Sequence, residues 1–414
     1  MKHLFAIITT ILLLTACQKD EEVAPYNPVK NVKHTVLVYM PSENNLSPYA
    51  QNDINEMIQG RKSVGDDCDL LIFVDKASQT EMPFIARISA DSKDPVDTLY
   101  QYPADFYTSE PSKFQEVLQR MISFSPTSQD YGLVLWGHAN GWILENDGRD
   151  FIRRAYGVDN GNNEATAQMK EPARWLNIPD MAKSFKQVGK HWRFLLFDCC
   201  NMQNAEVAYE LRSTTDYIIA SPAEITGEGA PYDNLVPDFF IEDTEQMAIK
   251  TCADYYAQLD YVQGHLPISV VKTSQMQALA DATKNILPEI AAWLKTSNPT
   301  QGIIYYYNYD SAYKPDREKM MYDMNDMIRA ALADAPEKFN AWKTAFRQAV
   351  IYAEMSKRWH ANSVNFNDFT VTEEKYGGMS MFFPLQKYTN ASHDYNNDIK
   401  KLEWYQAVGW STQQ

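Results

Sequence analysis

The fold is decided by residues 195–202, LLFDCCNM, taken together with residues 133–142, LVLWGHANGW. Each segment is a short apolar run that stops at a reactive side chain, Cys200 in the first and His138 in the second. Such runs predict buried strands of an α/β sheet. Because ligands of open α/β sheets bind at the carboxyl ends of the strands, two adjacent strands of this kind would bring an imidazole beside a thiol. That pair is the minimum needed for nucleophilic catalysis by cysteine.

The neighbours of Cys200 refine this prediction. Side chains alternate between the two faces of a strand, so Asp198 and Cys200 are expected on one face and Cys199 on the other. Residues 204–211 have helical periodicity and follow Cys200 closely. A helix N-terminus lowers the pKa of a nearby thiol, which predicts an activated Cys200. Cys199 is expected to be a small buried hydrophobic residue.

The order and spacing of these motifs resemble the clostripain-like cysteine peptidases, which have a caspase-like fold. The motifs are W-G-H-x-x-G-W at 136–142, F-D-x-C-x-M at 197–202, T-V-L-V-Y-M at 35–40, G-E-G-A-P-Y at 227–232 and G-M-S-M-F-F-P at 378–384. The resemblance covers most of the chain after residue 33. It implies an α/β/α sandwich with a largely parallel central sheet, and a smaller C-terminal α+β region.

The resemblance also implies roles for individual residues. Cys200 is expected to be the nucleophile and His138 the general base, and the backbone amides of Ala139 and Cys200 are expected to hold the oxyanion. The chain departs from the family's more common residues at three positions: Ala139 replaces glycine, Cys199 a small residue, and Asn201 an apolar one.

Two acidic residues are candidates for substrate binding. Asp198 is open to three interpretations: a cap of the following helix, a buried carboxylate paired with a local basic group, or a pocket residue that selects arginine or lysine. Its shared face with Cys200 and the resemblance favour the last. Glu228, between Gly227 and Gly229, is a second candidate, although acidic residues in loops are usually solvated.

The N-terminus predicts export. Residues 1–17 combine a basic start, an apolar core and a small-residue site that ends in Cys17, which is typical of a lipoprotein signal peptide. Residues 18–32 are polar, contain two prolines and predict a tether. The acidic run after Cys17 resembles the tags of surface lipoproteins, which predicts lipid anchoring at the bacterial outer membrane, on the cell surface.

Alternating strand and helix signals predict βαβ units. We expect strands at 35–40, 69–74, 132–137, 193–198 and 217–221, helices at about 47–60, 112–125, 178–188 and 203–213, and a hairpin at 84–102. These units predict a peptidase domain at 33–265. Further helices at 244–264 and 272–294 and a strand at 378–384 suggest a second, C-terminal domain at 266–414.

Residues 143–176 interrupt this rhythm with a long polar loop, and long loops are usually functional or disordered. The loop carries five basic residues between the predicted histidine and cysteine strands. We therefore expect an enzyme that cuts after basic residues to cleave its own chain in this loop. The candidate bonds follow Arg149, Arg153, Arg154, Lys170 and Arg174.

Composition limits the partners. The formal net charge of −16 disfavours nucleic acid and anionic membrane as general partners, so membrane contact is expected through the lipid anchor alone. No zinc-binding spacing, P-loop or dinucleotide fingerprint is present, so no cofactor or metal is implied. The acidic loops could bind Ca²⁺, although they contain no EF-hand pattern.

The sequence therefore predicts a lipid-anchored cysteine endopeptidase that acts on proteins or peptides with basic residues through Cys200 and His138. The alternative is a surface lipoprotein on a peptidase scaffold that binds peptide or glycan without cutting it.

Overall fold

The computed structural model describes residues 31–78, 80–90, 93–144, 155–161, 174–263, 266–309, 318–361, 364–388 and 394–412. The predicted signal peptide, Cys17 and most of the tether lie outside these ranges, as do Arg149, Arg153, Arg154 and Lys170. Within the described ranges, no helix has both the length and the apolar character needed to cross a membrane.

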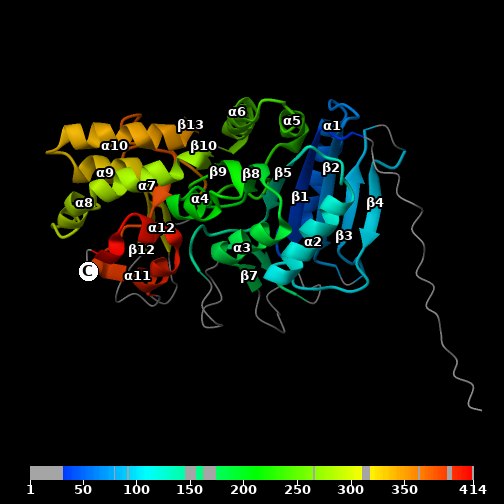
Figure 1. Ribbon diagram of the computed structural model, residues 1–414, viewed down its shortest axis with the longest axis horizontal. Helices are drawn as coiled ribbons and strands as arrows, with labels where there is room; N and C mark the ends of the chain where they lie inside the picture. Colours follow the sequence, from blue (N-terminus) through cyan, green and yellow to red (C-terminus); the bar gives the residue numbers. More distant parts are fainter. Residues whose placement is uncertain are drawn as a thin grey trace, which may run out of the picture.

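A central sheet of nine strands organises the described residues (Figure 1). In spatial order the strands are β13 (Val350–Glu354), β10 (Ile268–Lys272), β9 (Thr215–Ala220), β8 (Trp192–Asp198), β5 (Asp130–Trp136), β1 (His34–Ser42), β2 (Cys68–Lys76), β3 (Phe84–Ile88) and β4 (Val96–Gln101). The five strands from β9 to β2 are parallel, and the outer strands on both sides are antiparallel. The strands predicted at 35–40, 69–74, 132–137, 193–198 and 217–221 and the hairpin predicted at 84–102 are confirmed, whereas only residues 380–381 of the strand predicted at 378–384 form a strand.

Helices cover both faces of this sheet (Figure 1), so the predicted α/β/α sandwich is confirmed. One face is covered by α1 (Ser47–Arg61), α5 (Tyr232–Asp238) and α6 (Thr244–Gln263). The other is covered by α2 (Pro111–Ser123), α3 (Ile178–Val188) and α4 (Ala205–Leu211). In α3 the apolar side chains of Ile178, Met181 and Phe185 recur at helical spacing and are buried, and Gly189 ends the helix in the left-handed conformation.

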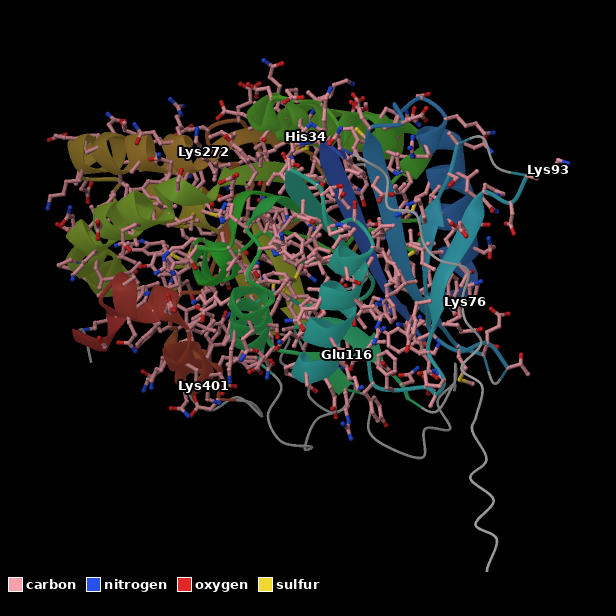
Figure 2. The ribbon with its side chains drawn as sticks, turned by 45° about the vertical axis from the view of Figure 1, so that its right-hand side comes forward. His34, Lys76, Lys93, Glu116, Lys272 and Lys401 are labelled. Carbon is pink, nitrogen blue, oxygen red and sulfur yellow. The ribbon has the colours of Figure 1, made fainter. Side chains whose placement is uncertain are left out.

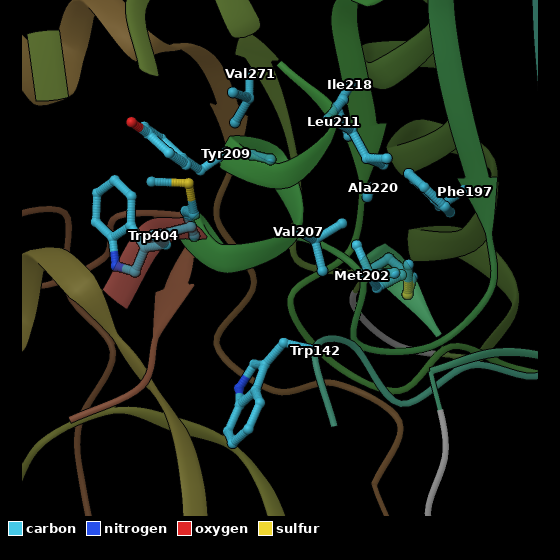
Figure 3. Packing of buried hydrophobic residues seen from close by; sticks show 14 of the residues in the cluster. Trp142, Phe197, Met202, Val207, Tyr209, Leu211, Ile218, Ala220, Val271 and Trp404 are labelled. Atoms are coloured by element: carbon cyan, nitrogen blue, oxygen red, sulfur yellow. The ribbon is translucent and has the colours of Figure 1, made fainter. Parts of the chain in front are cut away.

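Strand β8 shows how alternation builds the two halves of the core. Leu195 and Phe197 pack on the α4 side, whereas Phe194 and Leu196 pack on the α6 side. Figure 3 shows the first of these layers, in which Phe197 and Met202 lie near the side chains of α4. Cys199 continues the same face and is 1% exposed, as predicted for a small buried residue.

The described parts of the long 143–176 segment contain regular structure. Strand β6 (Tyr156–Asp159) pairs with β7 (Arg174–Leu176) in a separate two-stranded sheet. An additional bridge joins Ala139 to Tyr156. The middle of the segment is therefore attached to the loop that follows β5. The polar composition of the segment did not predict this attachment.

The C-terminal part carries its own small sheet of β11 (Tyr305–Tyr309), β12 (Glu318–Asp323) and β14 (Ser380–Met381). Its helices are α7 (Met276–Asn285), α8 (Leu287–Trp293), α9 (Met324–Ala331), α10 (Pro336–Ala349), α11 (Tyr395–Asp398) and α12 (Glu403–Ala407). The helix predicted at 272–294 is divided, because Lys272 ends β10 and Pro288 lies in the first turn of α8. The central sheet continues through β10 and β13, so the predicted boundary at residue 265 does not coincide with an edge of the sheet.

His34 is the first residue of β1 and lies at the amino-terminal end of the parallel strands, opposite the end where Cys200 lies. Figure 2 shows His34 at the end of β1, where its Nδ1 lies 2.9 Å from Asp130 Oδ1 and its Nε2 lies 3.4 Å from Glu242 Oε2. It therefore joins β1 to the start of β5, at the end of the sheet remote from Cys200.

Candidate active site

The register of β5 and β8 brings His138 and Cys200 to corresponding positions. Trp136 is the partner of Asp198 in the parallel ladder, and the amide of Gly137 donates to the carbonyl of Asp198 at 3.2 Å. His138 and Cys200 each follow this registered pair by two residues. The prediction that adjacent strands end at the two reactive residues is confirmed in position.

Both side chains line a cavity of about 390 Å³. Its wall also includes Asp198, Ala139 and Glu224, and no lysine or arginine is among the described residues that line it. Cys200 Sγ contacts the neighbouring loop, where the amide nitrogen of Ile225 lies 3.4 Å away. The cavity thus exposes a thiol and an imidazole in acidic surroundings.

Asparagine 45 holds the imidazole. Its Oδ1 lies 2.7 Å from His138 Nε2, and Asn45 belongs to the turn that follows β1. A carboxamide oxygen can only accept, so the proton is on Nε2 and Nδ1 keeps a free lone pair. The arrangement leaves Nδ1 able to act as a base. The sequence analysis did not identify Asn45 because 93 residues separate it from His138.

Burial keeps both reactive groups neutral. It raises the pKa of the Cys200 thiol to about 12, with Glu224 and Asp198 adding to the increase. It lowers the pKa of His138 to about 4. The prediction that the following helix lowers the thiol pKa is therefore wrong for the free protein, because α4 begins only at Ala205 and desolvation outweighs its dipole. The resting cavity thus contains a neutral thiol and a neutral imidazole.

The backbone at Ala139 is suited to hold an anion. In its bridge to Tyr156, the hydrogen bonds are made by the flanking residues: Asn140 donates to Ala155, and Gly157 donates to His138. In such a non-hydrogen-bonded pair the central amides point away from the partner strand, so the Ala139 N–H faces away from β6. The φ angle of Ala139 is not positive, so alanine replaces the more common glycine without backbone strain.

The turn after Cys200 depends on two special backbone positions. Asn201 has φ 60°, and asparagine tolerates this left-handed region better than an apolar residue does. Gly141 has φ 62°, and a Cβ there would lie 2.3 Å from Asn204 Oδ1 and 2.6 Å from the Asn201 carbonyl. Glycine at 141 therefore allows the histidine loop to pack against the cysteine loop.

Asp198 lies at the base of the cavity and is 3% exposed. Its Oδ2 accepts from the Tyr232 hydroxyl at 2.7 Å, and its Oδ1 accepts from the Tyr255 hydroxyl at 2.6 Å. The amide of Ala230 also hydrogen bonds to it, and burial still raises its pKa. No salt bridge to Asp198 is present among the described residues, so the paired-carboxylate interpretation has no support there.

A second acid lies behind Asp198. Asp53 Oδ2 accepts from Trp136 Nε1 at 2.6 Å, and burial, reinforced by Asp198, raises the pKa of Asp53 to about 8. The pKa of Glu56, which accepts from the amide of Tyr232, is also raised by burial and by acidic neighbours. Asp198 is thus flanked by two further carboxyl groups that do not themselves line the cavity.

The remaining predicted residues have less central positions. Glu228 is exposed and does not line the cavity, whereas Glu224 of the same loop does. Arg174 forms a salt bridge with Glu110 and stacks on Tyr107, with 4.0 Å between the guanidinium and the ring centre. The structure adds Trp175 and His360 to the cavity wall, two residues from distant segments that no local motif marked.

Comparison with known proteins agrees with this geometry. Residues 38–413 match the Clostripain family. A clostripain from Hathewaya histolytica is 26% identical over 234 residues, which are 50% of this chain and 42% of that protein, so the match spans less than half of its length.

Two solved structures each match more than nine-tenths of this chain. A secreted C11 cysteine protease from Bacteroides thetaiotaomicron, in complex with an irreversible peptide inhibitor, has a TM-score of 0.73 at 29% identity and covers 92% of this chain and 99% of that one. An inactive zymogen C11 protease from Parabacteroides distasonis has a TM-score of 0.71 at 25% identity, covering 91% and 98%. With a family match that extends over most of its length, this chain belongs to the clostripain family.

Proposed function

We propose that the protein is a cysteine endopeptidase that cleaves peptide bonds after basic residues. The observation that carries this proposal is the placement of His138 and Cys200, each two residues beyond a registered pair of adjacent strands, on the wall of one cavity. Membership of the clostripain family and the inhibitor complex of the Bacteroides relative support it.

The mechanism follows from the neutral pair. Cys200 Sγ attacks the scissile carbonyl carbon while His138 takes the thiol proton, and the oxyanion is held by the backbone amides of Ala139 and Cys200. His138 then donates that proton to the leaving amine, and a thioester on Cys200 remains. Water, deprotonated by His138, attacks the thioester and regenerates the thiol. His138 is neutral above its pKa of about 4, so a ring nitrogen lone pair is available at neutral pH.

Substrate selection is assigned to Asp198. An ionised carboxylate offers about four acceptor sites, and three donors occupy part of them, which leaves capacity for a guanidinium or ammonium group. Glu224 contributes a second acidic group on the wall. An assay of the purified chain on reporter peptides ending in arginine, lysine, aspartate or leucine tests the proposal, with cleavage expected after arginine or lysine only.

We expect Asn45→Ala to lower kcat by about 10-fold to 100-fold with little change in KM, because it loses the contact that orients a general base worth 10²–10⁴-fold. Asn45→Asp should retain the acceptor but place a carboxylate against the imidazole, which raises the pKa of His138. Since the base must be neutral, the acidic limb of the kcat/KM profile should then move to higher pH. Unchanged kcat in Asn45→Ala, with an unshifted limb in Asn45→Asp, would show that Asn45 has no positioning role.

We propose that the chain cuts itself in the 143–176 loop, as first inferred from its composition. The candidates Arg149, Arg153, Arg154 and Lys170 lie outside the described residues, and Arg174 is engaged by Glu110 and Tyr107. We therefore favour the first four. The existence of an inactive zymogen in the Parabacteroides relative supports an activation step of this kind.

Wild type and Cys200→Ala should be compared by denaturing gel and fragment mass. Two fragments that remain associated are expected for wild type, because β5 and β8 are adjacent in one sheet, and a single intact chain is expected for the variant. An intact wild type with full activity, or a variant nicked at the same bond, would contradict self-activation.

Lipid attachment at Cys17 is a proposal that rests on the sequence alone. When the chain is expressed in a bacterial host with its leader, it should partition into the detergent phase, and Cys17→Ala should not. Equal partitioning of both proteins would exclude the anchor.

A further inference from the structure

Another cavity, of about 890 Å³, lies in the C-terminal part of the molecule. Its wall comes from four segments, at 291–300, 384–387, 394–400 and 405–410. Figure 1 shows α8, α11 and α12, which belong to these segments, together at the end of the molecule opposite β4. None of the described residues that line this cavity also lines the catalytic cavity, so the two are separate.

The C-terminal cavity is large enough for a small organic molecule. Its volume is more than twice the 390 Å³ of the catalytic cavity. Pockets for small ligands measure about 300–1,000 Å³ and combine apolar walls with a few polar groups that fix the orientation of the ligand. The buried side chains of Leu385, Tyr405 and Trp410 contribute apolar surface to this wall. A ligand with an apolar body would therefore gain free energy by leaving water there.

The charged groups on the wall are mainly positive. Lys295, Lys387 and Lys400 line the cavity, and Asp394 is the one acidic residue among the described residues that do so. The carboxylate of Asp394 accepts from the amide of Asn397 at 3.1 Å and thereby caps the start of α11. The whole chain has 54 acidic residues against 38 lysines and arginines, so the local balance of charge is the reverse of the overall one.

Two of these lysines are available to a ligand. Lys295 and Lys400 are exposed, and within the described part of the chain their side chains form no ion pair or hydrogen bond. Lys387 Nζ donates to the Tyr322 hydroxyl at 3.1 Å and to the Lys319 carbonyl at 3.3 Å, both of which are neutral acceptors. An ammonium group attracts an anion as a compact charge and offers it three donors. Cations from three segments therefore surround an apolar wall.

We propose that the C-terminal cavity binds an amphipathic organic anion, a small molecule with one acidic head group on an apolar body. The buried aromatic and aliphatic side chains receive the body, and Lys295 and Lys400 attract the head group. The binding does not depend on whether the chain cleaves peptides, because the catalytic cavity has a different set of lining residues.

Binding should be measured with anilinonaphthalene sulfonate, whose fluorescence rises when its rings leave water, on the full chain carrying Cys200→Ala. One saturable site per chain is expected, with a Kd of roughly 10 to 100 µM, from the affinity that ligands of this size reach per atom. N-phenylnaphthylamine has the same rings without the sulfonate and should bind at least about 5-fold more weakly. Added NaCl should weaken the binding of the sulfonate only.

Matched variants locate the site. Lys295→Gln combined with Lys400→Gln should raise the Kd of the sulfonate by about 5-fold to 30-fold, because two attractive charges at a partly exposed site are lost. Lys183→Gln combined with Lys186→Gln removes two exposed charges from α3 and should leave the Kd unchanged. Both double variants should melt at the temperature of the parent chain.

The proposal is overturned if the parent chain has no saturable site or binds the uncharged probe equally well. It is also overturned if the folded chain with Lys295→Gln and Lys400→Gln keeps its affinity. An equal loss of affinity in the two double variants would refute it as well, because the sulfonate would then respond to net charge and not to this cavity.

Discussion

Cys200→Ala should abolish peptide hydrolysis, with kcat/KM reduced by at least about 10³-fold, whereas Cys199→Ala should keep most of the activity. The two thiols are adjacent in sequence but lie on opposite sides of the chain. Cys200 lines the cavity with His138, and Cys199 is buried in the core on the other face. Only Cys200 can reach a substrate carbonyl without unfolding β8.

The comparison needs a check on folding. Cys200→Ala removes the contact of Sγ with the Ile225 amide, and Cys199→Ala removes a buried sulfur at a cost of about 1 kcal/mol, a common value for core substitutions. Thermal melting should therefore show both variants folded at the assay temperature. Full activity in Cys200→Ala would exclude the mechanism and leave the non-catalytic alternative, a peptide- or glycan-binding protein on this scaffold.

Asp198→Asn should selectively lose cleavage after arginine and lysine. Removing one partner of a buried charge pair costs about 2–5 kcal/mol, which corresponds to a decrease in kcat/KM from about 30-fold to several thousand-fold. The effect is expected to be large because Asp198 is almost completely buried, and a cationic side chain that enters the cavity leaves water behind.

Asp198 also accepts two tyrosine hydroxyls, so a structural contribution must be separated from the charge. Tyr255→Phe removes one of these donors and keeps the carboxylate, and it should preserve the preference for basic residues. The rate at which iodoacetamide alkylates Cys200 should be similar in Asp198→Asn and wild type, which would show that the thiol environment is intact. If Asp198→Asn keeps its preference, or if Tyr255→Phe loses it equally, then Asp198 holds the fold rather than the substrate.

The core of the fold could be predicted because its signals are local. Residues 133–136 and 195–198 are apolar runs, and their alternation assigns Phe197 and Cys199 to one face and Asp198 to the other. The sequence by itself thus identified the parallel strands and placed the two candidate catalytic residues, His138 and Cys200, just beyond their ends. It did not reveal that β10 and β13 extend the same sheet, because pairing between strands from distant segments leaves no local pattern.

The tertiary structure alone decided the hydrogen-bond partners and the pKa values of the site residues. These depend on contacts between distant segments and on the exclusion of water. Asn45 meets His138 across 93 residues, and Tyr255 meets Asp198 across 57. The helix after Cys200 suggested a low thiol pKa, but burial raises it to about 12, because desolvation depends on everything packed around the sulfur. The acidic composition was equally visible in the sequence, yet only the folding of β1, β2 and β6 toward one point buries Glu43, Asp75 and Asp159 beside one another. Local patterns determine which residues end a strand, and packing determines which groups those residues meet and which charges they can carry.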